Sequence, residues 1–160
     1  MSGVVWLARF ALRLAAAIFL VALALLTLAD VLGRYVFNFP VRGAVELTEA
    51  IMVGTIFTGI VLATEAHQHV TVDLLTMKLG PRGRRIQLAF SLLLACIVSA
   101  LLGAVTWTQA LAALDYGDKT TMLGLPMAPQ VFFMSGFLFL NALVYVAHLW
   151  RLWRRPAEPA

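Results

Sequence analysis

Four long apolar stretches, separated by short clusters of charge, dominate the hydrophobic pattern of this chain. None contains Asp, Glu, Lys or Arg, and they cover Leu14–Ala29, Ala50–Thr64, Ile86–Leu114 and Thr120–Trp150. A helix needs about 20 mainly apolar residues to cross the ~30 Å hydrocarbon layer of a bilayer. The pattern therefore predicts an all-α integral membrane protein with four transmembrane helices, at approximately 12–33, 44–65, 86–113 and 128–151.

Composition limits the number of domains. Hydrophobic residues make up 62% of the 160 residues and charged residues only 12%. The spans and their connections use almost the whole length, so no segment is left to bury a separate soluble core. We expect a single membrane domain over residues 1–160. The formal charge of +4 does not indicate nucleic acid, because the basic residues flank hydrophobic ends, where they orient helices in a bilayer.

The distribution of Lys and Arg predicts the orientation of the spans. Nine basic residues lie on one side, namely Arg9, Arg13, Lys78, Arg82, Arg84, Arg85, Arg151, Arg154 and Arg155, and three lie on the other, namely Arg34, Arg42 and Lys119. Because cytoplasmic flanks are enriched in Lys and Arg, both termini are expected in the cytoplasm.

Small and polar residues in the spans predict where helices touch. Two spans carry small residues at intervals of four: Ala50, Gly54 and Thr58 beside Thr55, Gly59 and Ala63 in the second, and Ser91, Ala95, Ser99 and Gly103 in the third. Such ridges let another helix approach closely. Asn141 lies near the middle of the fourth span, where an unpaired amide is costly, so it should hydrogen-bond to a neighbouring helix.

The segment after the second span is too short and too polar to cross the membrane. Within residues 70–79, Val72, Leu75 and Leu79 fall on one helical face, and Gly80-Pro81 follows. This indicates a short interfacial amphipathic segment between the second and third spans.

The three histidines raise the question of a haem or metal site. A haem held by two histidines needs both imidazoles within the helices and facing each other, but His67, His69 and His148 all fall near one interface. His67, His69 and Asp73 have spacings that allow a metal site, although a solvated connection is the favoured explanation. No phosphate loop, nucleophile elbow or zinc motif occurs. We therefore predict no enzyme activity, no cofactor and no metal.

Polar residues crowd the connection between the first and second spans. Asp30 and Arg34 are four residues apart and can pair on one helix. Asn38 stands two residues before Pro40, which suggests an N-cap with proline in the first turn of the second helix. Two glutamates three residues apart, Glu46 and Glu49, then share one face of that helix.

These residues resemble the small membrane subunit of tripartite ATP-independent periplasmic (TRAP) transporters, the DctQ-like family. The resemblance covers roughly residues 10–150 and runs through three segments in order: Asp30…Arg34-Tyr35-x-Phe37-Asn38-x-Pro40…Glu46-Leu47-x-Glu49, then His69-x-Thr71-Val72-Asp73-Leu74-Leu75, then Gly117…Thr121-x-Leu123-Gly124-Leu125-Pro126. Each segment stands at a helix boundary.

The resemblance implies a non-catalytic subunit in the inner membrane of a bacterium, in a sodium-coupled symporter for organic acids. Its partners would be a large membrane subunit of about a dozen spans, for which it acts as scaffold, and a periplasmic substrate-binding protein. The residues expected to organise the partner interface are Asp30, Arg34, Tyr35, Asn38, Pro40, Glu46, Glu49, His69, Asp73 and Pro126. Two alternatives stay open: a haem- or quinone-linked four-helix subunit, and a self-sufficient small homo-oligomeric transporter.

Overall fold

Four long helices make up most of the chain in a computed structural model, which describes residues 3–65 and 81–154. They are α1 (Gly3–Tyr35), α2 (Ala44–Glu65), α4 (Pro81–Tyr116) and α5 (Ala128–Arg154). All four are long and apolar enough to cross a membrane. In the described part of the chain there is no strand, only an isolated bridge between Lys119 and Pro126. The predicted fold class is confirmed.

The predicted spans and the helices differ mainly in length. The second helix has the predicted bounds, whereas α1 begins nine residues before its predicted span and α4 begins five residues before. Hydropathy marks the part of a helix that lies in hydrocarbon, but a helix satisfies its own backbone and continues through the headgroup layer without penalty. With 36 residues, α4 is longer than a helix needs to be to cross the hydrocarbon layer.

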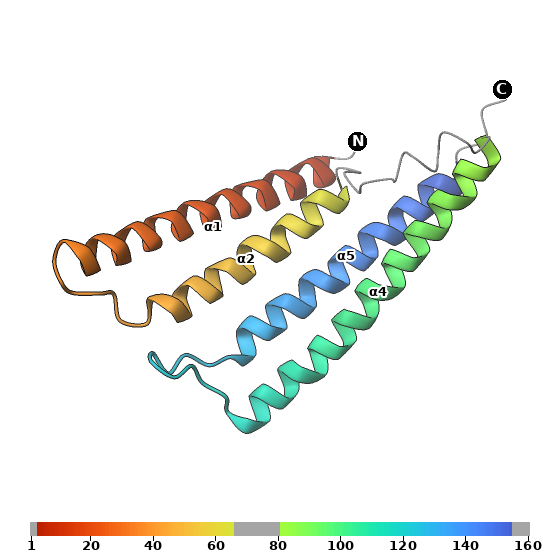
Figure 1. Cartoon of the computed structure of the whole chain (residues 1–160). Helices are drawn as coiled ribbons and strands as arrows, with labels where there is room; N and C mark the ends of the chain where they lie inside the picture. The colour runs from red at the N-terminus through yellow and green to blue at the C-terminus, as the bar shows by residue number, and fades with distance from the viewer. Residues whose placement is uncertain (1–2, 66–80, 155–160) are drawn as a thin grey trace.

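The helices form an open row in the order α1, α2, α5, α4 (Figure 1). Each packs mainly against its neighbours in this order, so α1 and α4 lie at the two edges. The buried share of each helix depends on its position in the row. No residue in the most apolar stretch of α1 is buried, whereas 33% of the residues in the corresponding stretch of α5 are buried. The row therefore leaves long apolar faces on its edge helices.

The two helix connections within the described residues lie at one end of the row (Figure 1). We call this end, with residues 36–43 and 117–127, the connection end. The opposite end, where α1 begins and α5 finishes, is the terminal end. The side of the membrane on which each end lies stays a prediction.

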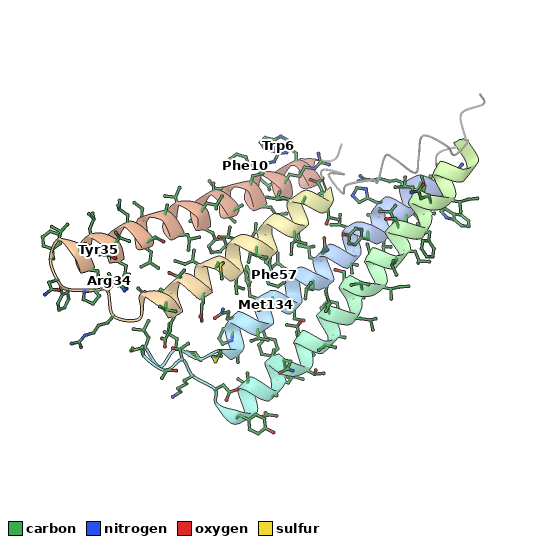
Figure 2. All side chains as sticks on the ribbon, in the orientation of Figure 1. Trp6, Phe10, Arg34, Tyr35, Phe57 and Met134 are labelled. Atoms are coloured by element: carbon green, nitrogen blue, oxygen red, sulfur yellow. The ribbon has the colours of Figure 1, made fainter. Side chains whose placement is uncertain are left out.

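The predicted small-residue ridge at Ala50, Gly54 and Thr58 brings α1 and α2 together. Gly54 and Thr58 are buried, and a Cβ added at Gly54 would lie 2.7 Å from the ring of Phe19 in α1. The same ring meets Phe133 of α5 edge-on, with centroids 6.4 Å apart. Farther along, Phe57 of α2 and Met134 of α5 lie between their two helices (Figure 2). Close backbones and interlocked aromatic rings are how helices associate in lipid.

Polar side chains join α4 to α5 within the row. Asn141 Nδ2 donates to Ser99 Oγ at 3.1 Å, and Ser99 Oγ donates to the carbonyl oxygen of Leu138 at 3.1 Å. Ser135 Oγ donates to the carbonyl oxygen of Gly103 at 2.9 Å. The predicted bond from Asn141 to a neighbouring helix is confirmed, and the small-residue ridge of α4 contacts α5 through Ser99 and Gly103.

Candidate partner interface at the connection end

An ion pair organises the end of α1. Arg34 Nη2 donates to Asp30 Oδ2 at 2.8 Å, as the spacing predicted, while Asp30 Oδ1 accepts from the backbone amide of Val41 at 3.1 Å. Arg34 is 57% exposed and Asp30 only 17%. An exposed pair contributes little to stability by itself. Asp30 matters more for the path of the chain. By accepting from the Val41 amide, it holds the later half of the α1–α2 connection against the end of α1.

The prediction of Asn38 as an N-cap is wrong. The second helix begins at Ala44, so Asn38 and Pro40 both lie in the connection before it. Asn38 instead has a φ of 52°, a left-handed conformation that asparagine tolerates better than most residues. It turns the chain after α1 so that the Phe39 amide donates to the carbonyl oxygen of Gly33 at 2.8 Å. The residue acts as a turn residue after α1, not as the start of α2.

Glu46 links the start of α2 to the α4–α5 connection. Its Oε1 accepts from the Met122 amide at 2.5 Å and its Oε2 from the Leu123 amide at 2.9 Å. Both oxygens of one carboxylate in the first turn of α2 thus hold the tip of the α4–α5 connection. Hydrogen bonds to an ionised acceptor are the stronger kind.

Gly43 gives this tip the space to dock. It has a φ of 70°, and a Cβ added there would overlap the side chain of Leu123. Glycine is the residue that adopts a positive φ without steric cost. The close approach of the two connections therefore depends on a glycine directly before α2 as well as on Glu46.

The α4–α5 connection is held by its own hydrogen bonds. The Thr120 amide donates to the carbonyl oxygen of Leu125 at 2.9 Å, and the Leu125 amide donates to Thr120 Oγ1 at 3.0 Å. At its base, the Met127 amide donates to the carbonyl oxygen of Asp118 at 2.9 Å. Pro126, one of the predicted interface residues, lies in this arrangement opposite Lys119. The connection is thus a defined loop that presents Met122 at its tip.

The other predicted residues at this end are exposed. Tyr35, at the end of α1, is 81% exposed and lies beside Arg34 (Figure 2), and Pro40 and Glu49 are also exposed. The structure thus unites Asp30 with Arg34 and Glu46 with the loop that contains Pro126. It does not bring Tyr35, Pro40 or Glu49 into that cluster.

A family comparison gives this arrangement its context. Residues 23–155 match the family model described as tripartite ATP-independent periplasmic transporters, DctQ component. The chain belongs to the DctQ family. It is therefore the small membrane component of a TRAP transporter and a multi-pass membrane protein. A search of curated proteins finds no significant match to this DctQ chain.

The match includes both connections, so the cluster around Glu46 lies inside the DctQ region. Sequence reasoning did not find its two partners, Met122 and Leu123. These residues contribute backbone amides, which every residue except proline carries, so no side-chain pattern signals them. The Arg42-Gly43 turn was the available clue, because glycine before a helix often marks a special backbone conformation.

At the terminal end, two contacts also escaped the sequence reasoning. Arg9 of α1 pairs with Glu65 of α2, and Arg85 Nη2 of α4 donates to the carbonyl oxygen of Leu152 in α5 at 2.8 Å. Each joins neighbouring helices of the row. The predicted residues His69 and Asp73, the neighbouring His67 and the amphipathic segment predicted at 70–79 lie outside the described residues.

Proposed function

We propose that this DctQ chain is a non-catalytic, static scaffold for the large membrane subunit of a sodium-coupled transporter of organic acids. The large subunit would carry substrate and sodium, while the small subunit holds part of it fixed in the bacterial inner membrane. On this proposal both termini are cytoplasmic. The connection end then faces the periplasm and helps to dock the substrate-binding protein.

The distribution of polar groups is the observation that supports this role. The four apolar runs contain no Asp, Glu, Lys or Arg. Some polar side chains within them join α4 to α5, as in the bonds from Asn141 to Ser99 and from Ser135 to Gly103. Others, such as Thr55 and Thr106, donate to carbonyl oxygens of their own helices. Organic anions and sodium ions at membrane depth require charged groups or several inward-facing oxygens. A chain built in this way is suited to support a transport pathway formed elsewhere.

The contact with the large subunit is proposed on the second small-residue ridge of α2, formed by Thr55, Gly59 and Ala63. These residues are only partly covered in the chain, and no atom lies within 4 Å of the position of a Cβ at Gly59. The first ridge, by contrast, is already occupied by α1. An uncovered notch of small residues lets a partner helix approach its backbone closely.

Co-purification tests this contact. The large subunit should be retained by the unchanged chain and lost with Gly59→Leu, because an isobutyl group would fill the notch. Ala104→Leu, which adds similar bulk at an exposed position of α4, is the matched control and should retain the partner. Equal retention by both variants would show that the ridge is not the interface.

Docking of the binding protein is tested through Glu46. Glutamine at 46 has an NH2 donor in place of one carboxylate oxygen, so in Glu46→Gln one of the two amides loses its acceptor and the tip of the loop should loosen. We expect reduced uptake in vesicles containing all three components, with the large subunit still bound. Asp115→Asn removes an exposed carboxylate at the same end and should leave uptake unchanged. Normal uptake by Glu46→Gln would refute the docking role.

Reconstitution separates the scaffold from the two alternatives. The scaffold predicts uptake only when the large subunit and binding protein are present. Uptake by the chain alone would establish a self-sufficient transporter, and a Soret band in the purified protein would establish a haem subunit.

A further inference from the structure

Two apolar grooves meet at Trp153 at the terminal end. The larger, of about 490 Å³, lies along α5 and is lined by Val146, Leu149, Trp150, Trp153 and Arg154. The smaller, of about 340 Å³, lies between α4 and α5 and is lined by Arg85, Ile86, Ala89, Leu152 and Trp153. Each groove combines apolar side chains with one arginine. Trp153, which is 80% exposed, belongs to both.

The arginines stand where the apolar spans finish. Arg85 directly precedes the uncharged run of residues 86–114, and Arg154 follows the uncharged run that ends at Trp150. Tryptophan and arginine at such positions lie at headgroup depth, where the indole bridges apolar and polar layers and the guanidinium meets phosphate. Both arginines and Trp153 are therefore at the level of lipid headgroups.

The guanidinium groups are held in orientations that suit an anion. Arg154 stacks over the ring of Trp150, with Cζ 4.8 Å from the ring centroid. Stacking uses the face of the guanidinium, so its N–H edge stays directed away from the ring. Within residues 3–65 and 81–154 no carboxylate pairs with Arg154. On the other side, the bond from Arg85 to Leu152 positions its guanidinium beside the smaller groove.

We infer that these two grooves bind one anionic phospholipid. Its phosphate is held by Arg154, and its two acyl chains enter the two grooves on either side of Trp153. A zwitterionic lipid offers the same phosphate but adds a cationic headgroup that Arg154 repels, and a free phosphate would leave both apolar grooves unfilled. The pairing of one charged site with two adjoining apolar channels matches a diacyl anion in both charge and shape. This inference does not depend on the scaffold role proposed above.

Lipid titration of the full chain tests the inference. The purified protein in detergent is titrated with phosphatidylglycerol or phosphatidylcholine, and bound lipid is counted by native mass spectrometry. We expect phosphatidylglycerol to bind more tightly. Arg154→Gln should weaken phosphatidylglycerol roughly fivefold, the contribution of one basic residue near an anionic headgroup, and should weaken phosphatidylcholine by a smaller factor. Arg154→Lys should retain most of the affinity.

Matched controls come from α1 at the same end. Arg13 and Trp6 are both exposed, so Arg13→Gln and Trp6→Ala should not change the binding of either lipid. Trp153→Ala, which removes the wall shared by the grooves, should weaken phosphatidylglycerol. Unchanged melting temperatures would show that the variants are folded.

Three results would overturn the inference. Equal affinity for phosphatidylglycerol and phosphatidylcholine would show that the arginines do not select the lipid. Displacement of the lipid by inorganic phosphate would make the site a phosphate site. The same loss with Arg13→Gln as with Arg154→Gln would show that only net charge matters.

Discussion

The hydroxyl of Ser99 and the amide of Asn141 should respond differently to removal, although one hydrogen bond joins them. Asn141 Nδ2 donates to Ser99 Oγ, which itself donates to Leu138. Asn141 Oδ1 is buried and has no hydrogen-bond partner among the described residues. Asn141→Leu therefore removes one bond together with one unsatisfied acceptor, and Ser99 keeps its bond to Leu138. Ser99→Ala removes this bond and the bond from Ser99 to Leu138, and it leaves the whole buried amide without a partner.

The magnitudes follow from this difference. A hydrogen bond between membrane helices contributes about 0.6 kcal/mol on average and up to about 1.7 kcal/mol. Leaving a buried polar group unsatisfied costs about 1–3 kcal/mol. For Asn141→Leu the two contributions oppose each other, so the free energy of unfolding should change by less than about 1 kcal/mol. For Ser99→Ala they act together, and we expect a loss of about 1–3 kcal/mol.

Reversible unfolding in mixed detergent micelles, followed by circular dichroism, measures both variants. The double variant completes a thermodynamic cycle that isolates the coupling between the two residues. A loss above about 3 kcal/mol for Asn141→Leu would mean that the amide makes more interactions than the structure shows. A neutral Ser99→Ala would refute the argument that an unpaired amide is costly at this position.

Three further changes test the packing and the connections. Gly54→Val should lower the free energy of unfolding by about 1–3 kcal/mol, because the added atoms meet the facing phenylalanine ring of α1; an unchanged value would contradict the close contact. Asp30→Ala should accelerate hydrogen exchange at the Val41 amide, which loses its acceptor, whereas Arg34→Ala should leave that amide protected; equal exchange in both variants would count against Asp30 as the anchor. Gly43→Ala should cost about 1–2 kcal/mol of stability through its positive φ alone, and a variant as stable as the unchanged chain would show that the turn relaxes freely.

The existence of the helices was predictable because lipid permits few structures. A chain that crosses hydrocarbon must satisfy its backbone within each span, so four long uncharged runs leave little choice. The Asp30–Arg34 pair was predictable for a similar local reason, since residues four apart meet on any helix. The bond from Asn141 was predictable in kind, because a buried amide in lipid needs a partner. In each case a short-range rule was sufficient.

The order of the row and the contacts of Glu46 were not predictable in this way. The amides that Glu46 binds lie 76 and 77 residues farther along the chain, and nothing in their side chains identifies them. The two ridges of α2 contain equally small residues, so the sequence does not say which one α1 occupies. The prediction of Asn38 as an N-cap was wrong because asparagine is favoured both at N-caps and in left-handed turns. Its conformation was decided by the path of the chain between α1 and α2.

The hydrogen bonds between Glu46 and the α4–α5 connection also have a consequence for biosynthesis. The first hairpin is complete long before Leu123 leaves the ribosome, so Glu46 is exposed for as long as the second hairpin is missing. The carboxylate can bind the later loop only after α4 has crossed the bilayer and carried the loop to the same side. A cysteine pair placed at these two points would therefore report when that loop has crossed.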